Sequence, residues 1–272
     1  MRVVLISEVG AAVEGLSALL RGLGHEPVAL LSVRRDDERY PGLDELLRLA
    51  PPELDVVMPA TRDRIAPLLG QFDSDVALCF GFPWKIPPDA IATPRHGIVN
   101  GHPSLLPRYR GPSPVSWAVR NGDEQIGFTF HYMDADLDTG NILGQARISL
   151  GDEHGWEELT PKLAEAVGDI LPGVLERVER GDPGEPQDES RATYCGEFEP
   201  EFAWIDWTRS MAEIARQVRA WRFQPLSVEP RGALAKLAGE TVRVLRVGAE
   251  AGEGVAVECG DGTLWVVESE TA

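Results

Sequence analysis

The chain has 272 residues, of which 43% are hydrophobic and 26% charged, as in a globular protein with a substantial core. Asp and Glu outnumber Lys and Arg by 44 to 26, so the formal net charge is −18, and phosphate backbones and anionic lipids are not expected partners. Three widely spaced cysteines favour a reducing cytoplasm over a disulfide framework, and no apolar run is long enough to span a membrane.

The first part of the chain alternates strand-like and helix-like runs. Short runs rich in β-branched residues predict strands over residues 2–6, 27–33, 55–60, 75–82 and 96–102. Apolar residues at helical spacing predict helices over 11–24, 43–50 and 61–72, the last with Thr61 as N-cap. This alternation predicts an α/β fold with a Rossmann-like, doubly wound, mostly parallel sheet.

The pattern then changes. Residues 125–134 and 140–150 alternate polar and apolar side chains and predict a hairpin-like addition to the sheet. A long helix is expected over 155–181, broken or kinked near Pro172. Residues 182–193, rich in proline, glycine and acidic residues, predict a linker, so that residues 1–181 would form one domain.

The remaining residues, 194–272, predict a smaller β-rich domain. Its first part has one apolar helical face at Met211, Ile214, Val218 and Trp221. Short strands separated by glycine turns follow, as in a small β-barrel. We expect its aromatic and apolar residues to form a core, with dimerisation as the alternative; they are Trp204, Trp207, Trp221 and Leu226.

Two kinds of ligand site are excluded by spacing. A P-loop would need a lysine where Leu16 stands, and the first strand–helix turn lacks the G-x-G-x-x-G pattern of dinucleotide sites. Residues 134–140, "DADLDTG", resemble the start of a calcium loop, but Gly140 is seventh and the twelfth position is Gln145. No metal is expected.

Polar side chains end two of the predicted strands. Asn100 and His102 lie two residues apart at the end of one strand, which directs both to one face, and Asp138 opens the turn after another. Ligands bind at the carboxyl ends of strands in open α/β sheets. The amide can donate to a developing oxyanion, the imidazole can move a proton and the carboxylate can support the imidazolium. An Asn–His pair at the end of a strand can also have a purely structural role, in which it satisfies the hydrogen bonds of a buried turn.

Two further observations limit the chemistry. No Ser or Cys stands in a nucleophile elbow, which favours direct acyl-type transfer without a covalent enzyme intermediate. His131, on an alternating strand, could line the site or cap a sheet edge, and the second interpretation is favoured.

The same residues carry a resemblance to a known family. The runs "NGHPSLLPRYRG" (100–111) and "NGDEQIGFTFHYMDADLDTGNIL" (121–143) resemble the signature of the folate-dependent formyltransferases. Residues 1–181 are similar to the catalytic domain of that family. Residues 194–272, with "IDWTRSMAEIARQVRAWRFQP", resemble the OB-like carboxyl-terminal domain of the methionyl-tRNA branch and are expected to be truncated relative to it.

The resemblance implies a reaction and a set of site residues. The formyl donor would be 10-formyltetrahydrofolate, the acceptor an amine, and Asn100, His102 and Asp138 the catalytic trio. The implied cofactor-binding residues are Phe82, Trp84, Ile86, Ile98, Asp134 and Leu137, and the implied substrate loop contains Ser104, Leu105, Leu106, Pro107 and Arg110.

Charge decides which acceptor we expect. An enzyme that binds tRNA should carry a basic loop after the early strands, but residues 34–55 are mixed to acidic. Residues 194–272 contain 8 Lys and Arg against 13 Asp and Glu. We therefore expect a small-molecule N-formyltransferase acting on an amino acid, an amino sugar or a natural-product intermediate. The alternatives are a methionyl-tRNA formyltransferase, a formyltetrahydrofolate deformylase and a non-catalytic folate-binding module. The oligomeric state stays open, with a homodimer possible.

Overall fold

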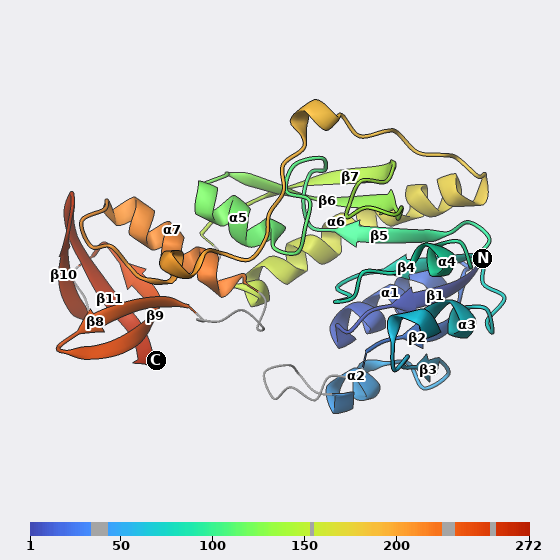
Figure 1. Ribbon diagram of the computed structural model, residues 1–272, viewed down its shortest axis with the longest axis horizontal. Helices are drawn as coiled ribbons and strands as arrows, with labels where there is room; N and C mark the ends of the chain where they lie inside the picture. The colour runs from blue at the N-terminus through green and yellow to red at the C-terminus, as the bar shows by residue number, and fades with distance from the viewer. Residues whose placement is uncertain (34–42, 153–154, 225–231, 251–253) are drawn as a thin grey trace. The chain divides into compact units, whose positions relative to one another are not determined.

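The computed structural model describes residues 1–33, 43–152, 155–224, 232–250 and 254–272 (Figure 1). Contacts divide the chain into two compact units. The first contains Met1–Arg110, Gly127–Arg147 and Leu163–Thr193, and the second contains Gly111–Ile126, Ile148–Lys162 and Tyr194–Ala272. The domain boundaries expected from the sequence stay a prediction.

A seven-stranded sheet with the order β3-β2-β1-β4-β5-β6-β7 organises the fold. Neighbours among the first five strands pair in parallel, whereas β6 runs antiparallel to β5. The predicted Rossmann-like, mostly parallel sheet is therefore confirmed. The strands are β1 (Arg2–Ile6), β2 (Glu26–Leu31), β3 (Asp55–Val57), β4 (Val76–Cys79), β5 (Ile98–His102), β6 (Gln125–Tyr132) and β7 (Ile142–Ser149).

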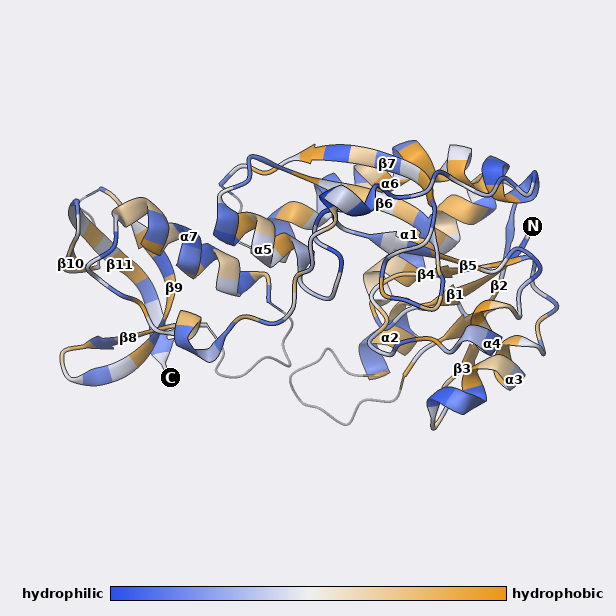
Figure 2. Cartoon of the chain, turned by 45° about the horizontal axis from the view of Figure 1, so that its top comes forward, coloured by the Kyte–Doolittle hydropathy of each residue, from blue (hydrophilic) through white to orange (hydrophobic). Residues whose placement is uncertain are grey.

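Among the described residues, five α-helices lie between successive strands of this sheet, and two more follow its last strand. The five are α1 (Gly10–Gly22), α2 (Leu43–Leu49), α3 (Ile65–Leu69), α4 (Pro88–Ile91) and α5 (Pro114–Asn121), and those that follow β7 are α6 (Trp156–Glu179) and α7 (Met211–Arg222). Strands β1 and β4 are buried along almost their whole length, and Figure 2 shows the hydrophobic residues concentrated on these central strands. Burial on both faces explains why their sequences do not alternate.

Two local expectations fail. The helix expected over 61–72 is a 3₁₀ turn, Arg62–Arg64, followed by α3, and Thr61 makes no side-chain cap. Helix α6 runs through Pro172 without the expected break, while the alternative expectation of a kink there stays a prediction. Its neighbours Leu171, Val174 and Leu175 are fully buried, so packing outweighs the loss of one backbone hydrogen bond.

The second unit contains a four-stranded antiparallel sheet with the order β10-β11-β9-β8. This separate sheet confirms the smaller β-rich carboxyl-terminal part. Helix α7 precedes it and starts with a capping box in which Ser210 and Glu213 exchange hydrogen bonds. The strands are β8 (Ala233–Leu237), β9 (Glu240–Gly248), β10 (Val255–Cys259) and β11 (Gly262–Thr271).

The expected aromatic core of this unit forms only in part. Trp221 is buried and packs edge-on against Phe198, whereas Trp207 is half-buried. Trp204 is 47% exposed, so its assignment to the core is wrong: it lies outside α7, just after a 3₁₀ turn. Leu226 lies outside the described residues.

None of the helices in the described part of the chain is long and apolar enough to cross a membrane.

Candidate active site

Three polar side chains converge at the carboxyl end of β5. Asn100 and His102 come from that strand, and Asp138 from the turn between β6 and β7. Asn100 Nδ2 donates to Asp138 Oδ1 at 3.4 Å, and His102 Nδ1 lies 3.7 Å from Asp138 Oδ2. Both residues of the strand therefore meet one carboxylate, which is 8% exposed.

His131 completes this cluster, although the sequence favoured a structural role for it. In the antiparallel pairing of β5 with β6, His131 lies directly opposite Asn100. Its Nε2 is 3.2 Å from Asn100 Nδ2 and 3.6 Å from Asp138 Oδ1. The signal that could have identified it is the register of the two strands, which the alternation alone does not give.

Hydrogen bonds to carbonyl oxygens indicate which nitrogen of each imidazole carries the proton. His102 Nε2 lies 2.8 Å from the carbonyl oxygen of Tyr109, and His131 Nδ1 lies 2.8 Å from that of Tyr132. Because carbonyls only accept, these two nitrogens must donate. In the neutral form His102 Nδ1 is then unprotonated and faces Asp138, while His131 Nε2 accepts from Asn100.

Burial and charge set the basicity of the cluster. Desolvation lowers the pKa of His102, while the Asp138 carboxylate and the bond to Tyr109 raise it in part. Burial, and then Asp138, raise the pKa of the Cys79 thiol, which makes it a poor nucleophile. The arrangement therefore offers a neutral imidazole that can accept a proton at Nδ1, next to a carboxylate that stabilises the imidazolium.

Acid should destabilise the fold through His102. Its pKa is lowered in the fold, so below the unfolded value of about 6.5 the unfolded chain binds the proton more readily. This part of the stability is kept above about pH 6.5 and is lost as the pH falls. We expect His102→Gln to flatten the decrease in unfolding free energy between about pH 7.5 and 5.5, measured by urea titration. An unchanged pH dependence would contradict the buried neutral state.

The residues expected to bind the cofactor divide into two groups. Ile86 and Ile98 are 4% and 0% exposed and belong to the apolar core of the sheet. Phe82 and Trp84, in the loop after β4, are partly buried against this core, with ring centroids 6.2 Å apart. Leu137 is 48% exposed. Asp134 is also exposed and accepts from the Thr139 hydroxyl at 2.6 Å.

Most residues of the expected substrate loop are buried or form hydrogen bonds within the protein. Ser104 Oγ donates to the carbonyl oxygen of Arg108 at 2.8 Å, and Leu106 N–H donates to Thr129 Oγ1 at 3.3 Å. Leu106 and Pro107 are buried and Leu105 is half-buried. Arg110 is 0% exposed and pairs with Glu189. Its guanidinium is thus engaged within the protein, and its place in the substrate loop stays a prediction.

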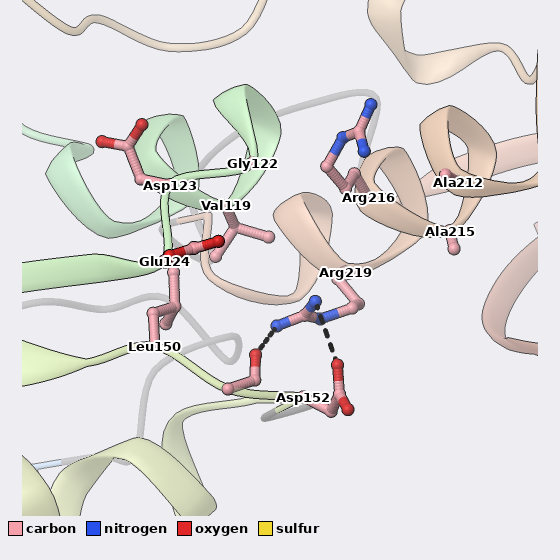
Figure 3. Close-up of a pocket in the computed structure, with 11 residues that line it drawn as sticks. Val119, Gly122, Asp123, Glu124, Leu150, Asp152, Ala212, Ala215, Arg216 and Arg219 are labelled. Carbon is pink, nitrogen blue, oxygen red and sulfur yellow. Dashed lines mark hydrogen bonds and ion pairs between the residues drawn. The ribbon is translucent and has the colours of Figure 1, made fainter.

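A separate pocket of about 350 Å³ lies in the second unit, between α5, α7 and the segment after β7 (Figure 3). Val119, Leu150 and Ala215 line its apolar part. Arg219 donates to the carbonyl oxygen of Gly151 and lies 3.9 Å from Asp152. None of the site residues expected from the sequence lines this pocket.

In the described residues, no group of three or more His, Cys, Asp and Glu side chains is suited to bind a metal ion.

Comparisons with known proteins agree with the fold and the motifs. The family model described as "Formyl transferase" matches residues 3–175, and "Formyl transferase, C-terminal domain" matches residues 197–272. A methionyl-tRNA formyltransferase from Synechococcus sp. (strain JA-3-3Ab) is 32% identical over 215 residues. The alignment covers 71% of this chain but 64% of that relative, so the chain matches less than two thirds of the relative's length.

Two solved structures share the fold at low sequence identity. HypX from Aquifex aeolicus, crystallised with tetrahydrofolic acid, has a TM-score of 0.68 and 19% identity, and the match covers 99% of this chain and 44% of HypX. WlaRD, a sugar 3N-formyl transferase, has a TM-score of 0.67 and 16% identity, and the match covers 99% of this chain and 97% of WlaRD. At these identities the likeness concerns the fold.

Proposed function

The chain belongs to the formyl transferase family, and we propose that it transfers a formyl group from 10-formyltetrahydrofolate to the amine of a small molecule. The observation that carries this proposal is the convergence of Asn100, His102 and His131 on the buried Asp138 carboxylate. An amide donor and a neutral imidazole that lie 3.4 and 3.7 Å from one carboxylate are groups suited to direct acyl transfer.

Each residue of this cluster would have its own role in the reaction. Asn100 would exchange its 3.4 Å hydrogen bond to Asp138 for one to the formyl oxygen, as the amine attacks and that oxygen gains negative charge. His102 takes the proton from the attacking nitrogen at Nδ1, and Asp138 stabilises the resulting imidazolium. His102 then returns the proton to the departing folate nitrogen, so that the amine gains the formyl group and the enzyme is unchanged. His131 holds Asn100 in place through its Nε2 acceptor.

The loop after β4 fits a flat heterocycle. Phe82 and Trp84 present partly buried aromatic rings beside the apolar cluster that contains Ile86 and Ile98. Ile86 and Ile98 are buried in the core, whereas Asp134 and Leu137 are exposed. When bound there, 10-formyltetrahydrofolate supplies an activated formyl group. HypX, the structural neighbour crystallised with tetrahydrofolic acid, supports a folate in this fold.

Charge supports a small amine as the acceptor. The net charge of −18 opposes tRNA, whose binding depends on neutralised phosphates, and attracts cationic amines. The fold match to WlaRD, a sugar 3N-formyl transferase, extends over 97% of that chain. An amino sugar, an amino acid or a natural-product amine is therefore the class of acceptor that we propose.

A tRNA acceptor is the second candidate, and the sequence relatives favour it. The Synechococcus relative is a methionyl-tRNA formyltransferase, and residues 197–272 match the carboxyl-terminal family model. The acidic composition of that part, with 8 Lys and Arg against 13 Asp and Glu, is the observation against it.

A panel of acceptors tests the proposal. The full chain is incubated with 10-formyltetrahydrofolate and single amines or methionyl-tRNA, and consumption of the donor is followed by absorbance. We expect consumption to depend on a small amine and to be lost in His102→Ala. Formate release without any amine would instead identify a hydrolase, and consumption only with tRNA would identify the second candidate. Binding of a folate analogue without turnover would indicate a folate-binding module.

A further inference from the structure

We propose that Gln187 is a positioning residue for Asp138 and that Arg110 holds Gln187 in place. The segment expected to be a linker, 182–193, would then contribute a residue that positions a member of the active site. The kinetic consequence of this inference rests on the proposed function, but the geometry and the main test do not.

The amide of Gln187 binds two main-chain carbonyl oxygens of the turn that carries Asp138. Its Nε2 donates to the carbonyl oxygen of Asp138 at 2.9 Å and to that of Gly140 at 2.8 Å. Both hydrogens of the amide nitrogen are thereby used. One side chain, 49 residues further along the chain, thus fixes the backbone from which the catalytic carboxylate extends.

Arg110 holds the other end of the same amide. Arg110 Nε and Nη2 donate to Gln187 Oε1 at 3.0 and 2.8 Å. Because a guanidinium only donates and carbonyls only accept, the amide has one orientation that satisfies all of its partners. The Arg110 charge is fully buried, and Glu189 compensates it with contacts of 3.0 Å to Nη1 and 2.6 Å to Nη2.

The turn needs such support because its backbone is strained. Asp138 has a φ of +57°, a left-handed conformation that residues other than glycine rarely adopt and that persists only when the surroundings fix it. Gly140 packs so closely that a Cβ there would overlap the carbonyl oxygen of Tyr132. Without the two bonds from Gln187, we expect Asp138 to relax and its carboxylate to move away from His102 and Asn100.

Two substitutions separate this role from general stability. Gln187→Leu removes every contact of the amide. Gln187→Glu keeps an acceptor for Arg110 but replaces the donor at the two carbonyls with a second acceptor, so it breaks the bonds to Asp138 and Gly140 and keeps the contact with Arg110. The matched control is Asn141→Ala, since Asn141 Nδ2 donates to the carbonyl oxygen of Pro183 at 2.9 Å and ties the same two segments together without touching Asp138.

The test is a histidine titration by ¹H–¹³C NMR on the full chain. The imidazole signals of the 5 histidines are assigned with the His102→Gln and His131→Gln variants. The ionisable groups facing His102 are Asp138, from the turn after β6, and His131, from β6 itself, while Cys79 of β4 faces Asp138. Asp138→Asn serves as the reference for complete loss of the carboxylate.

We expect Gln187→Leu and Gln187→Glu to lower the pKa of His102 in the same direction as Asp138→Asn, with Asn141→Ala unchanged. With an accepted amine, kcat should fall about 10- to 100-fold, with little change in the KM of the formyl donor. The inference is overturned when both Gln187 variants titrate like the wild type while folded. It is also overturned when Asn141→Ala shifts His102 equally. Lack of turnover with every acceptor would overturn the proposed function alone, because the titration still decides the role of Gln187.

Discussion

Replacing His102 by glutamine is expected to lower kcat by about 10²- to 10⁴-fold, the usual contribution of a positioned general base. Glutamine keeps a polar side chain of similar size beside the Tyr109 carbonyl but cannot take a proton from an amine. The KM of the formyl donor should change little, since the imidazole acts on the attacking nitrogen. Steady-state kinetics with an accepted amine measures both values.

The pH dependence sharpens this expectation. The acidic limb of the wild-type profile of kcat/KM should reflect titration of His102, whose pKa is lowered by burial, and should be absent from the residual activity of His102→Gln. His25→Gln is the matched control, because His25 contacts the amino terminus and not the site. Equal activity of His102→Gln and the control would remove His102 from the mechanism.

Replacing Asn100 by aspartate is expected to lower kcat by about 10²- to 10³-fold, the cost of losing one oxyanion donor. The change keeps the shape of the side chain but removes the N–H₂ group and places a second carboxylate 3.4 Å from Asp138 Oδ1. The added charge should also hold a proton in the cluster, which would move the pH optimum upward.

Rates of formyl transfer for Asn100→Asp and Asn100→Ala distinguish the two effects. Alanine removes the donor without adding charge, so both variants should lose kcat but only aspartate should shift the pH profile. The control is Asn141→Asp, which makes the same change in a residue that contacts Pro183. A near-normal kcat in Asn100→Ala would show that Asn100 does not stabilise the oxyanion.

The sheet was predictable because its signals are local. Strands covered on both faces are short apolar runs, and β1, β4 and β5 were placed within a few residues of their observed bounds. Asn100 and His102 could be singled out because they interrupt such a run at its carboxyl end, where α/β sheets bind ligands. Asp138 was less evident as a partner, because its selection depended on the family motif that contains it, residues 121–143.

Other parts of the site depend on pairings that no local pattern encodes. His131 faces Asn100 only because β6 pairs antiparallel with β5 in one register, and a shift of one residue would direct its side chain to the other face. Gln187 lies in a stretch whose composition indicates a linker, yet its amide reaches the Asp138 turn. Arg110 belongs to the recognised motif, but its burial against Gln187 and Glu189 became evident only in three dimensions.

The fate of the formyl carbon tests the central claim most directly. The chain is combined with a mixture of small amines, methionyl-tRNA and 10-formyltetrahydrofolate labelled with ¹³C in the formyl group. The label is then traced by NMR and mass spectrometry. The proposed function predicts a labelled formamide of a small amine, formed by the wild type and lost in His102→Gln. Label found only in formate or only on tRNA, or an unreacted donor, would contradict it.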